Sequence, residues 1–195
     1  MTSPENQFVS RGGLKLQAAL EAFGLDVGGL VCADFGANVG GFTDCLLQAG
    51  ARRVYAVDTG YGELAWRLRN DDRVVVMERT NALHTECPAE GGVDLVTIDV
   101  AFTPQRLIVP AGAGWLKRDG QIISLLKPHY ERAKLPGAPR QQRRQPLTDA
   151  EAEELRGRIV AELEGMGFVL AGSITSPLRG KGGNLEFLLL LTVGR

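Results

Sequence analysis

The sequence predicts an α/β fold with a mostly parallel sheet, and three observations support this prediction. Apolar runs of strand length alternate along the chain with segments whose apolar residues recur at helical spacing. The first run, Val31 to Phe35, leads through a glycine-rich turn directly into a helical pattern. A second run, Val54 to Val57, ends at Asp58, which follows Asp34 by 24 residues. Such repeated units are typical of doubly wound sheets with helices on both faces.

Four helices are predicted in the first two thirds of the chain. Leu14 to Phe23 is amphipathic, and Gly24 can close that helix. Phe42 to Leu47 resumes an apolar helical pattern after the glycine turn, and Leu64 to Leu68 predicts a short helix. Pro104 to Trp115 is predicted to be helical because a proline near the start suits the first helical turn.

A fifth helix is predicted after a change of composition. The segment from Arg132 to Gln145 is rich in Pro, Gly, Ala, Arg and Gln, and we expect a mobile surface loop there. Thr148 is then a good N-cap, and Glu151 completes a capping box. One apolar face follows, formed by Ala152, Leu155, Ile159, Leu163 and Met166.

Seven apolar runs have the length of strands. They are Val31 to Phe35, Val54 to Asp58, Val74 to Met77, Val93 to Val100, Gln121 to Leu126, Phe168 to Ile174 and Leu185 to Val193. If the last two form an antiparallel hairpin, the sheet has seven strands and is parallel except at one end.

Length and charge limit the classes of protein that this chain can represent. The 195 residues suffice for one core and are too few for two ordinary domains. We expect a single domain over 1–195, with 1–10 flexible and 132–146 a mobile basic loop. The net charge of −1 argues against indiscriminate binding to nucleic acid or to anionic membranes.

Cysteines and histidines give no sign of a metal or of a disulfide framework. Cys32, Cys45 and Cys87 are isolated, and His84 and His129 lack partners at metal-ligand spacing. We therefore expect no metal site and both histidines in surface or loop positions. The sequence shows no signal-peptide pattern at its start and no apolar run long enough to span a membrane. We therefore expect a cytoplasmic protein without membrane contact.

The glycine turn helps to choose the cofactor. It reads Gly36-Ala37-Asn38-Val39-Gly40-Gly41, so the second glycine of a dinucleotide fingerprint is missing. The pattern D-x-G-x-x-x-G is instead the usual first motif of methyltransferases that use S-adenosylmethionine. A glycine turn without any ligand is the alternative. With this cofactor, the predicted sheet corresponds to the Rossmann-like methyltransferase fold.

Seven residues are expected to hold the cofactor, and one of them is Asp99, near the end of the fourth predicted strand. We predict the methionine and ribose side to be lined by Asp34, Gly36, Asn38 and Gly40. Asp58 is expected to bind the ribose hydroxyls, because an acid at the tip of the second strand does so in doubly wound folds. Asn81 can hydrogen-bond an adenine edge, or it is simply a turn residue.

Several blocks of sequence resemble one family over about Phe8 to Leu191. They are SRGGLKL (10–16), GGFTDCLL (40–47), VYAVDTGYGELAWRLRNDDRVVVMERTN (54–81), DLVTIDVAF (94–102) and GNLEFLL (183–189). The blocks resemble the TlyA-type, hemolysin-A-like branch of the FtsJ-like RNA methyltransferases. The resemblance implies S-adenosylmethionine-dependent 2′-O-methylation of ribose in ribosomal RNA. The implied partner is RNA, as ribosomal RNA or a ribosomal subunit.

The chain departs from this family in four places. Family members usually begin with a small ribosomal-protein-like RNA-binding domain, and this chain starts where that domain would have ended, so we expect it to be lacking. The usual Ser-Thr of the glycine turn is Asn38-Val39, and the serine after the catalytic-strand acid is Ala101. A glycine-valine segment is replaced by Gly137 to Gln145.

The resemblance also implies a catalytic tetrad. FtsJ-like enzymes are known for Lys-Asp-Lys-Glu, and the matching residues are Lys15, Asp99, Lys127 and Glu186. Asp99 and Lys127 end predicted strands, at the sheet edge where open α/β folds bind ligands. A ribose hydroxyl must lose its proton as it attacks the methyl group, and burial beside Lys15 favours the neutral amine that a basic Lys127 requires. Lys15 is expected to position the nucleotide.

Basic residues near this edge are candidates for RNA contact. They are Arg11, Arg140, Arg143, Arg144, Arg179 and Lys181, and Lys15 can join them. The hypothesis predicts a salt-sensitive RNA affinity, whereas the alternative is a solvated loop.

Other functions are weighed against an RNA methyltransferase. The main alternative is a non-catalytic cofactor-binding or RNA-binding protein that retains the fold. A base-amine methyltransferase is disfavoured because Asp99-Val100-Ala101-Phe102 lacks the proline pair usual in that class. A membrane-lytic role finds no amphipathic membrane segment in the sequence. The RNA, the modified nucleotide and the oligomeric state cannot be read from the sequence.

Overall fold

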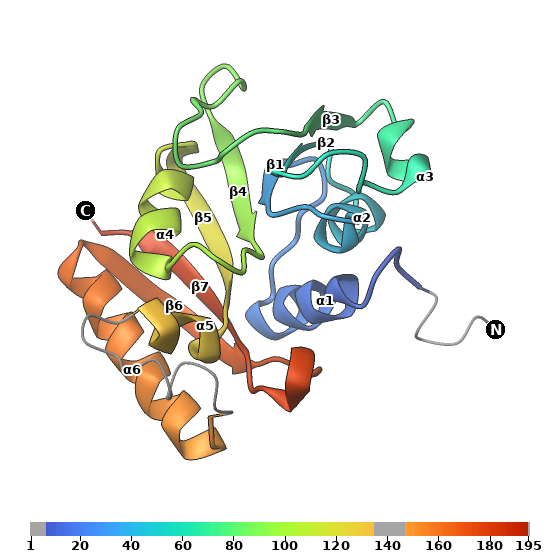
Figure 1. Ribbon diagram of the computed structural model, residues 1–195. Coiled ribbons are helices and arrows are strands. Elements are labelled where there is room, and N and C mark those ends of the chain that lie inside the picture. The colour runs from blue at the N-terminus through green and yellow to red at the C-terminus, as the bar shows by residue number, and fades with distance from the viewer. Residues whose placement is uncertain (1–6, 135–146, 195) are drawn as a thin grey trace.

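A seven-stranded sheet forms the centre of the computed structural model, which describes residues 7–134 and 147–194 (Figure 1). The strand order is β3-β2-β1-β4-β5-β7-β6. The strands are β1 (Val31–Phe35), β2 (Arg53–Val57), β3 (Val74–Met77), β4 (Val93–Ile98), β5 (Leu116–Leu126), β6 (Phe168–Thr175) and β7 (Phe187–Val193). The first five pair in parallel, and β7 pairs antiparallel with both β5 and β6. The predicted fold and its final hairpin are confirmed.

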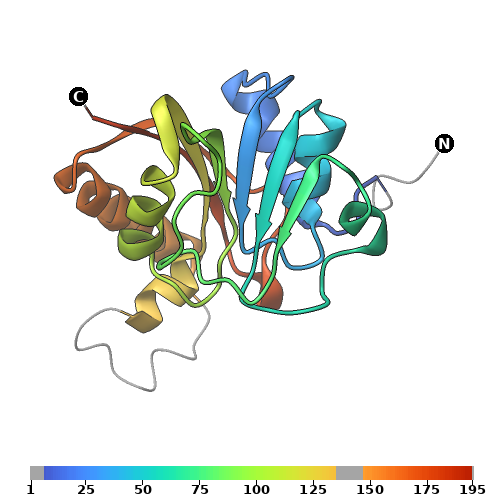
Figure 2. The same ribbon diagram turned by 90° about the horizontal axis from the view of Figure 1, so that it is seen from above.

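Helices cover both faces of this sheet (Figure 2). They are α1 (Gly12–Phe23), α2 (Gly41–Gln48), α3 (Trp66–Arg69), α4 (Gln105–Ala113), α5 (Pro128–Lys134) and α6 (Asp149–Gly165), with a 3-10 turn, η3, at Lys181–Gly183. One core cluster joins the sheet to α1, α2 and α3, and the other joins it to α4 and α6. Every residue of β1 is buried, as expected for a central parallel strand that is covered on both faces.

The glycine turns and the helix caps follow from the sequence. Gly24 adopts the left-handed conformation that ends α1. Thr148 and Glu151 form the predicted capping box at the start of α6. Four of the predicted apolar positions of α6 are buried, whereas Met166 is 47 % exposed because it lies at the C-cap, beyond the last helical residue.

Several boundaries differ from prediction by one or two residues, and the following differences are informative. The strand β5 begins at Leu116 rather than Gln121, because its polar first half pairs with β4 across a register shift. The strand β7 begins at Phe187, so Glu186 precedes it. Residues 128–134 form the helix α5, so Arg132 lies in that helix and not in a loop, and His129 is half-buried there. Seven residues are too few to show a helical apolar period, although Pro128 suits a helix start.

The segment before α1 also differs from the predicted flexible start. Phe8 is only 7 % exposed and packs over Gly13, where a Cβ atom would lie 2.3 Å from the Phe8 ring. The N–H of Val9 donates to Asp44 on α2 at 2.8 Å. Residues 1–6 lie outside the described part of the chain. Within that part, no helix combines the length and the apolar character needed to cross a bilayer.

Candidate active site

Two adjoining cavities lie at the carboxyl edge of the sheet. One, of about 370 Å³, is lined by Lys15, Lys127 and the turn that follows β1, and we call it the lysine cavity. The other, of about 380 Å³, is lined by Asp58, Asn81 and the segment that follows β4, and we call it the Asp58 cavity. Four residues line both cavities: Gly36, Asn38, Asp99 and Ala101. The two cavities therefore meet at these four residues.

The four residues of the implied tetrad form two ion pairs at the lysine cavity. Nζ of Lys15 lies 2.5 Å from Oε2 of Glu186, and Lys127 is ion-paired with Asp99. The side chains of both lysines are 13 % exposed, whereas Glu186 is 4 % and Asp99 25 % exposed. Each lysine thus points from a mostly buried position toward the cavity, with its charge balanced by an acid.

Close helix packing brings Lys15 to this position. A Cβ atom on Gly41 would lie 2.2 Å from Oγ of Ser10 and 3.0 Å from the backbone N of Gly13. Glycine therefore allows the start of α1 to contact the start of α2. Lys15, in the first turns of α1, is thereby carried over the turn between β1 and α2. Gly41 has this steric reason, whereas Gly13 leaves space for Phe8 and Gly40 leaves space for Leu68.

The Asp58 carboxylate is held by the backbone around it. Its Oδ2 accepts from the N–H of Asn38 at 2.8 Å, and its Oδ1 accepts from the N–H of Gly60 at 2.7 Å. Asn38 has a φ of 48°, so the turn residue itself adopts the left-handed conformation that asparagine tolerates. Each carboxylate oxygen has a further lone pair, so Asp58 can still accept two bonds from a diol in the cavity.

Asn81 lines the same cavity in a more constrained way. Its side-chain oxygen accepts from the N–H of Leu83 at 3.0 Å, which fixes the turn after β3. The oxygen is therefore engaged in the turn, and the NH₂ group is the part of Asn81 that suits a ligand acceptor.

Gly36 forms the floor shared by the two cavities. Its φ is +85°, and a Cβ atom would lie 2.6 Å from the backbone oxygen of Asp99. Any side chain would push the end of β1 away from the end of β4. Gly40, with a φ of +101°, instead faces α3, since its Cβ would lie 2.3 Å from Cδ1 of Leu68. The lining of the two cavities does not include Gly40, contrary to expectation.

Asp34 is also displaced from its expected role as a lining residue. It is fully buried, and its carboxylate accepts from the backbone N–H and the hydroxyl of Thr43 at 2.9 and 2.7 Å. The hydroxyl of Thr97 donates to it at 3.1 Å. Burial outweighs these bonds and raises the pKa of Asp34 to about 7. Asp34 ties the end of β1 to the start of α2 beneath the cavities, which is a structural role.

The predicted RNA-binding residues are only partly within the described chain. Arg11 is exposed and lines the lysine cavity. Arg179 is 52 % exposed and pairs with Asp149 at 2.7 Å. Arg140, Arg143 and Arg144 lie outside the described residues, as does the side chain of Lys181.

Aromatic residues at this edge are missed by sequence patterns. Phe102 lines the Asp58 cavity and is 78 % exposed, and its ring centroid lies 5.9 Å from that of Tyr130 on α5. His129 follows Lys127 by two residues; burial, with Lys127, Arg132 and Lys15, lowers its pKa. The position of Phe102 three residues after Asp99 is the one signal that sequence offers for it.

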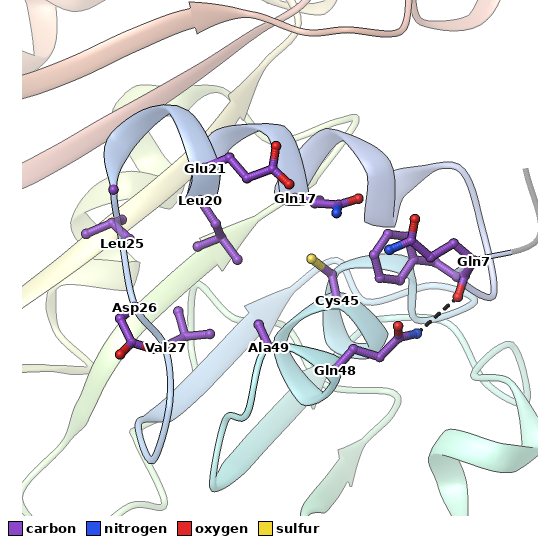
Figure 3. A pocket seen from close by; sticks show the side chains of 12 residues that line it. Gln7, Gln17, Leu20, Glu21, Leu25, Asp26, Val27, Cys45, Gln48 and Ala49 are labelled. Atoms are coloured by element: carbon purple, nitrogen blue, oxygen red, sulfur yellow. Dashed lines mark hydrogen bonds between the residues drawn. The ribbon is translucent and has the colours of Figure 1, made fainter. Parts of the chain in front are cut away.

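A larger cavity, of about 530 Å³, lies elsewhere, between α1 and α2 (Figure 3). Its lining combines apolar residues such as Leu20 and Val27 with Gln17, Glu21 and Gln48. The lysines of the tetrad are not among its lining residues, so size alone does not identify the active site.

The residues of the Asp58 cavity fit S-adenosylmethionine. Asp58 offers hydrogen-bond acceptors to the ribose diol, and Asn81 offers its amide to the adenine base. Gly36 has no side chain, so a ligand can approach its backbone closely where the two cavities meet. The volume is within the usual range of small-ligand sites. Fold and site together define the class of S-adenosylmethionine-dependent methyltransferases.

The chain belongs to the FtsJ-like methyltransferase family, which matches residues 8–193. The 16S/23S rRNA (cytidine-2′-O)-methyltransferase TlyA of Mycobacterium tuberculosis is 45 % identical over 192 residues, which cover 98 % of this chain and 70 % of that protein. A solved structure described as "Putative hemolysin from Streptococcus thermophilus" is 39 % identical, with a TM-score of 0.88, and covers 99 % of this chain and 70 % of that one.

A more distant structure shares the fold alone. The magnesium protoporphyrin IX methyltransferase of Synechocystis PCC 6803, with bound SAH, is 19 % identical and has a TM-score of 0.57 over 100 % of this chain and 89 % of that one. As a member of its family, the chain is an S-adenosylmethionine-dependent methyltransferase.

Proposed function

We propose that this protein transfers the methyl group of S-adenosylmethionine to a ribose 2′-hydroxyl of ribosomal RNA, in the cytoplasm where that RNA is found. The observation that carries the proposal is the pair of lysine–acid contacts at a cavity that adjoins the Asp58 cavity. The M. tuberculosis relative is named for the same reaction, the 2′-O-methylation of cytidine in ribosomal RNA.

Asp58, Asn81 and the Gly36 turn hold the cofactor in this proposal. When bound, the cofactor supplies a methyl group on a positively charged sulfur. The remaining work of the protein is to align the attacking oxygen, the methyl carbon and the sulfur, and to receive one proton. Because Gly36, Asn38, Asp99 and Ala101 line both cavities, the methyl group and the ribose can meet there.

Lys127 receives the proton of the 2′-hydroxyl. Asp99 orients its amine and is itself exposed enough to contact the incoming nucleotide. The Lys127 amine accepts this proton in its neutral form and ends the transfer as an ammonium ion paired with Asp99.

Lys15 and Glu186 hold the nucleotide. The Lys15 ammonium group is paired with buried Glu186, and two of its N–H bonds remain for ribose or phosphate oxygens. Arg11 and the exposed ring of Phe102 lie at the mouths of the cavities, where a phosphate and a base would pass. Arg140, Arg143, Arg144, Arg179 and Lys181 remain candidates for contacts to more distant phosphates.

Methyl transfer from labelled cofactor tests this proposal. The protein and its Lys127→Ala variant are incubated with either naked ribosomal RNA or ribosomal subunits, and cofactor binding is measured in parallel by calorimetry. We expect the wild type to transfer label to RNA. The Lys127→Ala variant should transfer almost none, although its affinity for the cofactor should be unchanged. Lys117→Ala is the matched control, because Lys117 pairs with Asp94 at 2.7 Å near the other end of the strands.

Each substrate form answers a separate part of the proposal. Label in subunits and not in naked RNA identifies the subunit as the partner. Cofactor binding without transfer to either form contradicts the proposal and favours a non-catalytic protein that retains the fold.

A further inference from the structure

Glu131 on α5 has a buried carboxylate that caps a different helix. It is 5 % exposed, and its Oε1 accepts from the backbone N–H of Gln105, the first residue of α4, at 2.8 Å. A carboxylate without such a partner would be costly in this position. Burial raises the pKa of Glu131 all the same, and the Gln105 N–H and Arg106 act against that rise.

The start of α4 needs a cap from outside. Its N-cap residue is Pro104, which has no side-chain acceptor, and the first turn contains no acidic residue. The first N–H groups of a helix have no partner within the helix, and an acid there is favoured by the helix dipole. Glu131 supplies the acidic cap that the local sequence of α4 lacks.

The same contact extends to β5. The side-chain oxygen of Gln105 accepts from the hydroxyl of Ser124 at 2.6 Å, and both residues are at most 2 % exposed. The start of α4, the strand β5 and the helix α5 are therefore joined by two buried hydrogen bonds in series.

One of the joined helices begins directly after Lys127, and the other begins six residues after Asp99. The helix α5 begins at Pro128, and the N–H groups of Tyr130 and Glu131 donate to the carbonyl of Lys127 at 2.9 and 3.3 Å. The helix α4 begins at Gln105, after the short segment that leads from Asp99. A shift of α4 relative to α5 would change the distance between Lys127 and Asp99.

We propose that Glu131 is a positioning residue for methyl transfer: by capping α4 from α5, it keeps Asp99 and Lys127 at ion-pair distance. The inference rests on the function proposed above and adds a residue to it. Glu131 touches neither cavity and acts through the segments that carry the reacting groups.

Substitution of Glu131 by Ala and by Gln separates this role from general stability. Glu131→Ala should lower kcat about 10- to 100-fold, because small misplacements of reacting groups have effects of that size. The KM for the cofactor should change less than about twofold, since the Asp58 cavity is not altered. Glu131→Gln should restore most of the rate, because its amide oxygen can still accept from Gln105.

Glu151→Ala is the matched control. Glu151 caps the start of α6 within its own capping box, so its loss removes a similar cap at a helix that does not follow a tetrad residue. It should lower stability and leave kcat unchanged. Equal kcat losses with Glu131→Ala and Glu151→Ala, or no rescue by Glu131→Gln, would overturn the proposal.

Removal of the Gln105 N–H tests the bond between Gln105 and Glu131 from the donor side. This experiment tests the role of Glu131 even if the Glu131→Ala variant does not fold. Gln105→Pro deletes the N–H at the first helical position, which proline suits, and the ψ of 152° at Pro104 permits a following proline. Gln105→Ala keeps the N–H and loses only the side chain. We expect a kcat loss with Gln105→Pro and a smaller one with Gln105→Ala; equal rates for the two would sink the proposal.

Failure of this inference is distinct from failure of the function. A wild type that transfers no methyl group to RNA contradicts the proposed function. An active wild type whose rate is kept in folded Glu131→Ala contradicts only the role of Glu131.

Discussion

Gly180 lies against the carboxylate of Glu186, so closely that a Cβ atom on Gly180 would be 2.0 Å from Oε1 of Glu186. The φ of Gly180 is −70°, which any residue can adopt. Glycine is therefore needed here for space and not for backbone conformation. The empty volume at Gly180 is what lets Glu186 turn toward Lys15.

Gly180→Ala should displace Glu186 and thereby release Lys15. We expect methyl transfer to fall at least about tenfold, because Lys15 would no longer be held over the cavity, with cofactor affinity unchanged. Gly157→Ala on α6 is the control, since nothing lies within 4 Å of its added methyl group. It should stabilise the protein by about 1 kcal/mol without changing the rate. Equal rates for Gly180→Ala and the wild type would contradict the role of this pair.

Lys15→Ala should destabilise the protein more than it would if Lys15 were a surface residue. It leaves Glu186, which is 4 % exposed, without its cation, and breaking a buried pair in this way costs about 3–5 kcal/mol. The double variant Lys15→Ala/Glu186→Gln should recover much of that loss and still transfer no methyl group. Urea unfolding measures the difference, and identical unfolding free energies for the two variants would count against a true buried pair.

Asp58→Ala should weaken binding of S-adenosylmethionine at least about 100-fold. Bonds to a charged acceptor contribute about 1.5–3 kcal/mol, and Asp58 can offer two to a diol. Asp58→Asn keeps one oxygen in place and should lose less. Calorimetric titration measures both, with Asp71→Ala as control because that acid pairs with Arg73 and lines neither cavity. Unchanged affinity in Asp58→Ala would place the cofactor elsewhere.

Stability should depend on pH through Asp34. Its pKa is raised to about 7 in the folded protein, from 3.8, so the folded state keeps a proton that the unfolded chain releases. The contribution of Asp34 to stability is fully present below about pH 4, falls as the pH rises, and is lost above about pH 7. The total change is up to about 4 kcal/mol.

Asp34→Asn removes the pH dependence that comes from Asp34, so a comparison with the wild type separates it from the pH dependence of other groups. Asparagine can accept from Thr43 with its oxygen and donate to Thr97 with its nitrogen, so the local bonds are retained. The unfolding free energy of the variant minus that of the wild type should therefore rise between pH 4 and 7. A difference that is flat across this range would show that Asp34 is ionised in the folded protein.

The fold was largely predictable because its signals are local. Strand-length apolar runs, a glycine turn with positive φ at Gly36, and the capping box at Thr148 each depend on a few neighbouring residues. The helix α5 escaped prediction because its buried residues are Pro128 and Glu131, which do not form an apolar stripe. The early start of β5 escaped because its first residues are polar and partly exposed.

The residues of the candidate site can be named from the sequence, but their arrangement cannot. The resemblance selected the four tetrad residues, and three of them line one cavity while Glu186 lies behind Lys15. Sequence spacing does not say which way a side chain points, so it predicts cofactor contacts for Asp34 and Gly40, whereas Asp34 faces Thr43 and Gly40 faces Leu68. The cap from Glu131 to Gln105 depends on tertiary packing and leaves no pattern in the sequence.

The contact between Lys15 and Glu186 spans 171 residues, and the strand that follows Glu186 is inserted between two strands that precede it in the chain. A ribosome making this protein releases the glycine turn, Asp99 and Lys127 well before Glu186. Until β7 is made, β6 has no partner through which to join the sheet, and Lys15 has no acid beside it. A copy that ends before Glu186 therefore lacks both the acid that pairs with Lys15 and the strand through which β6 joins the sheet, so the lysine cavity is completed only by the last part of the chain to be made.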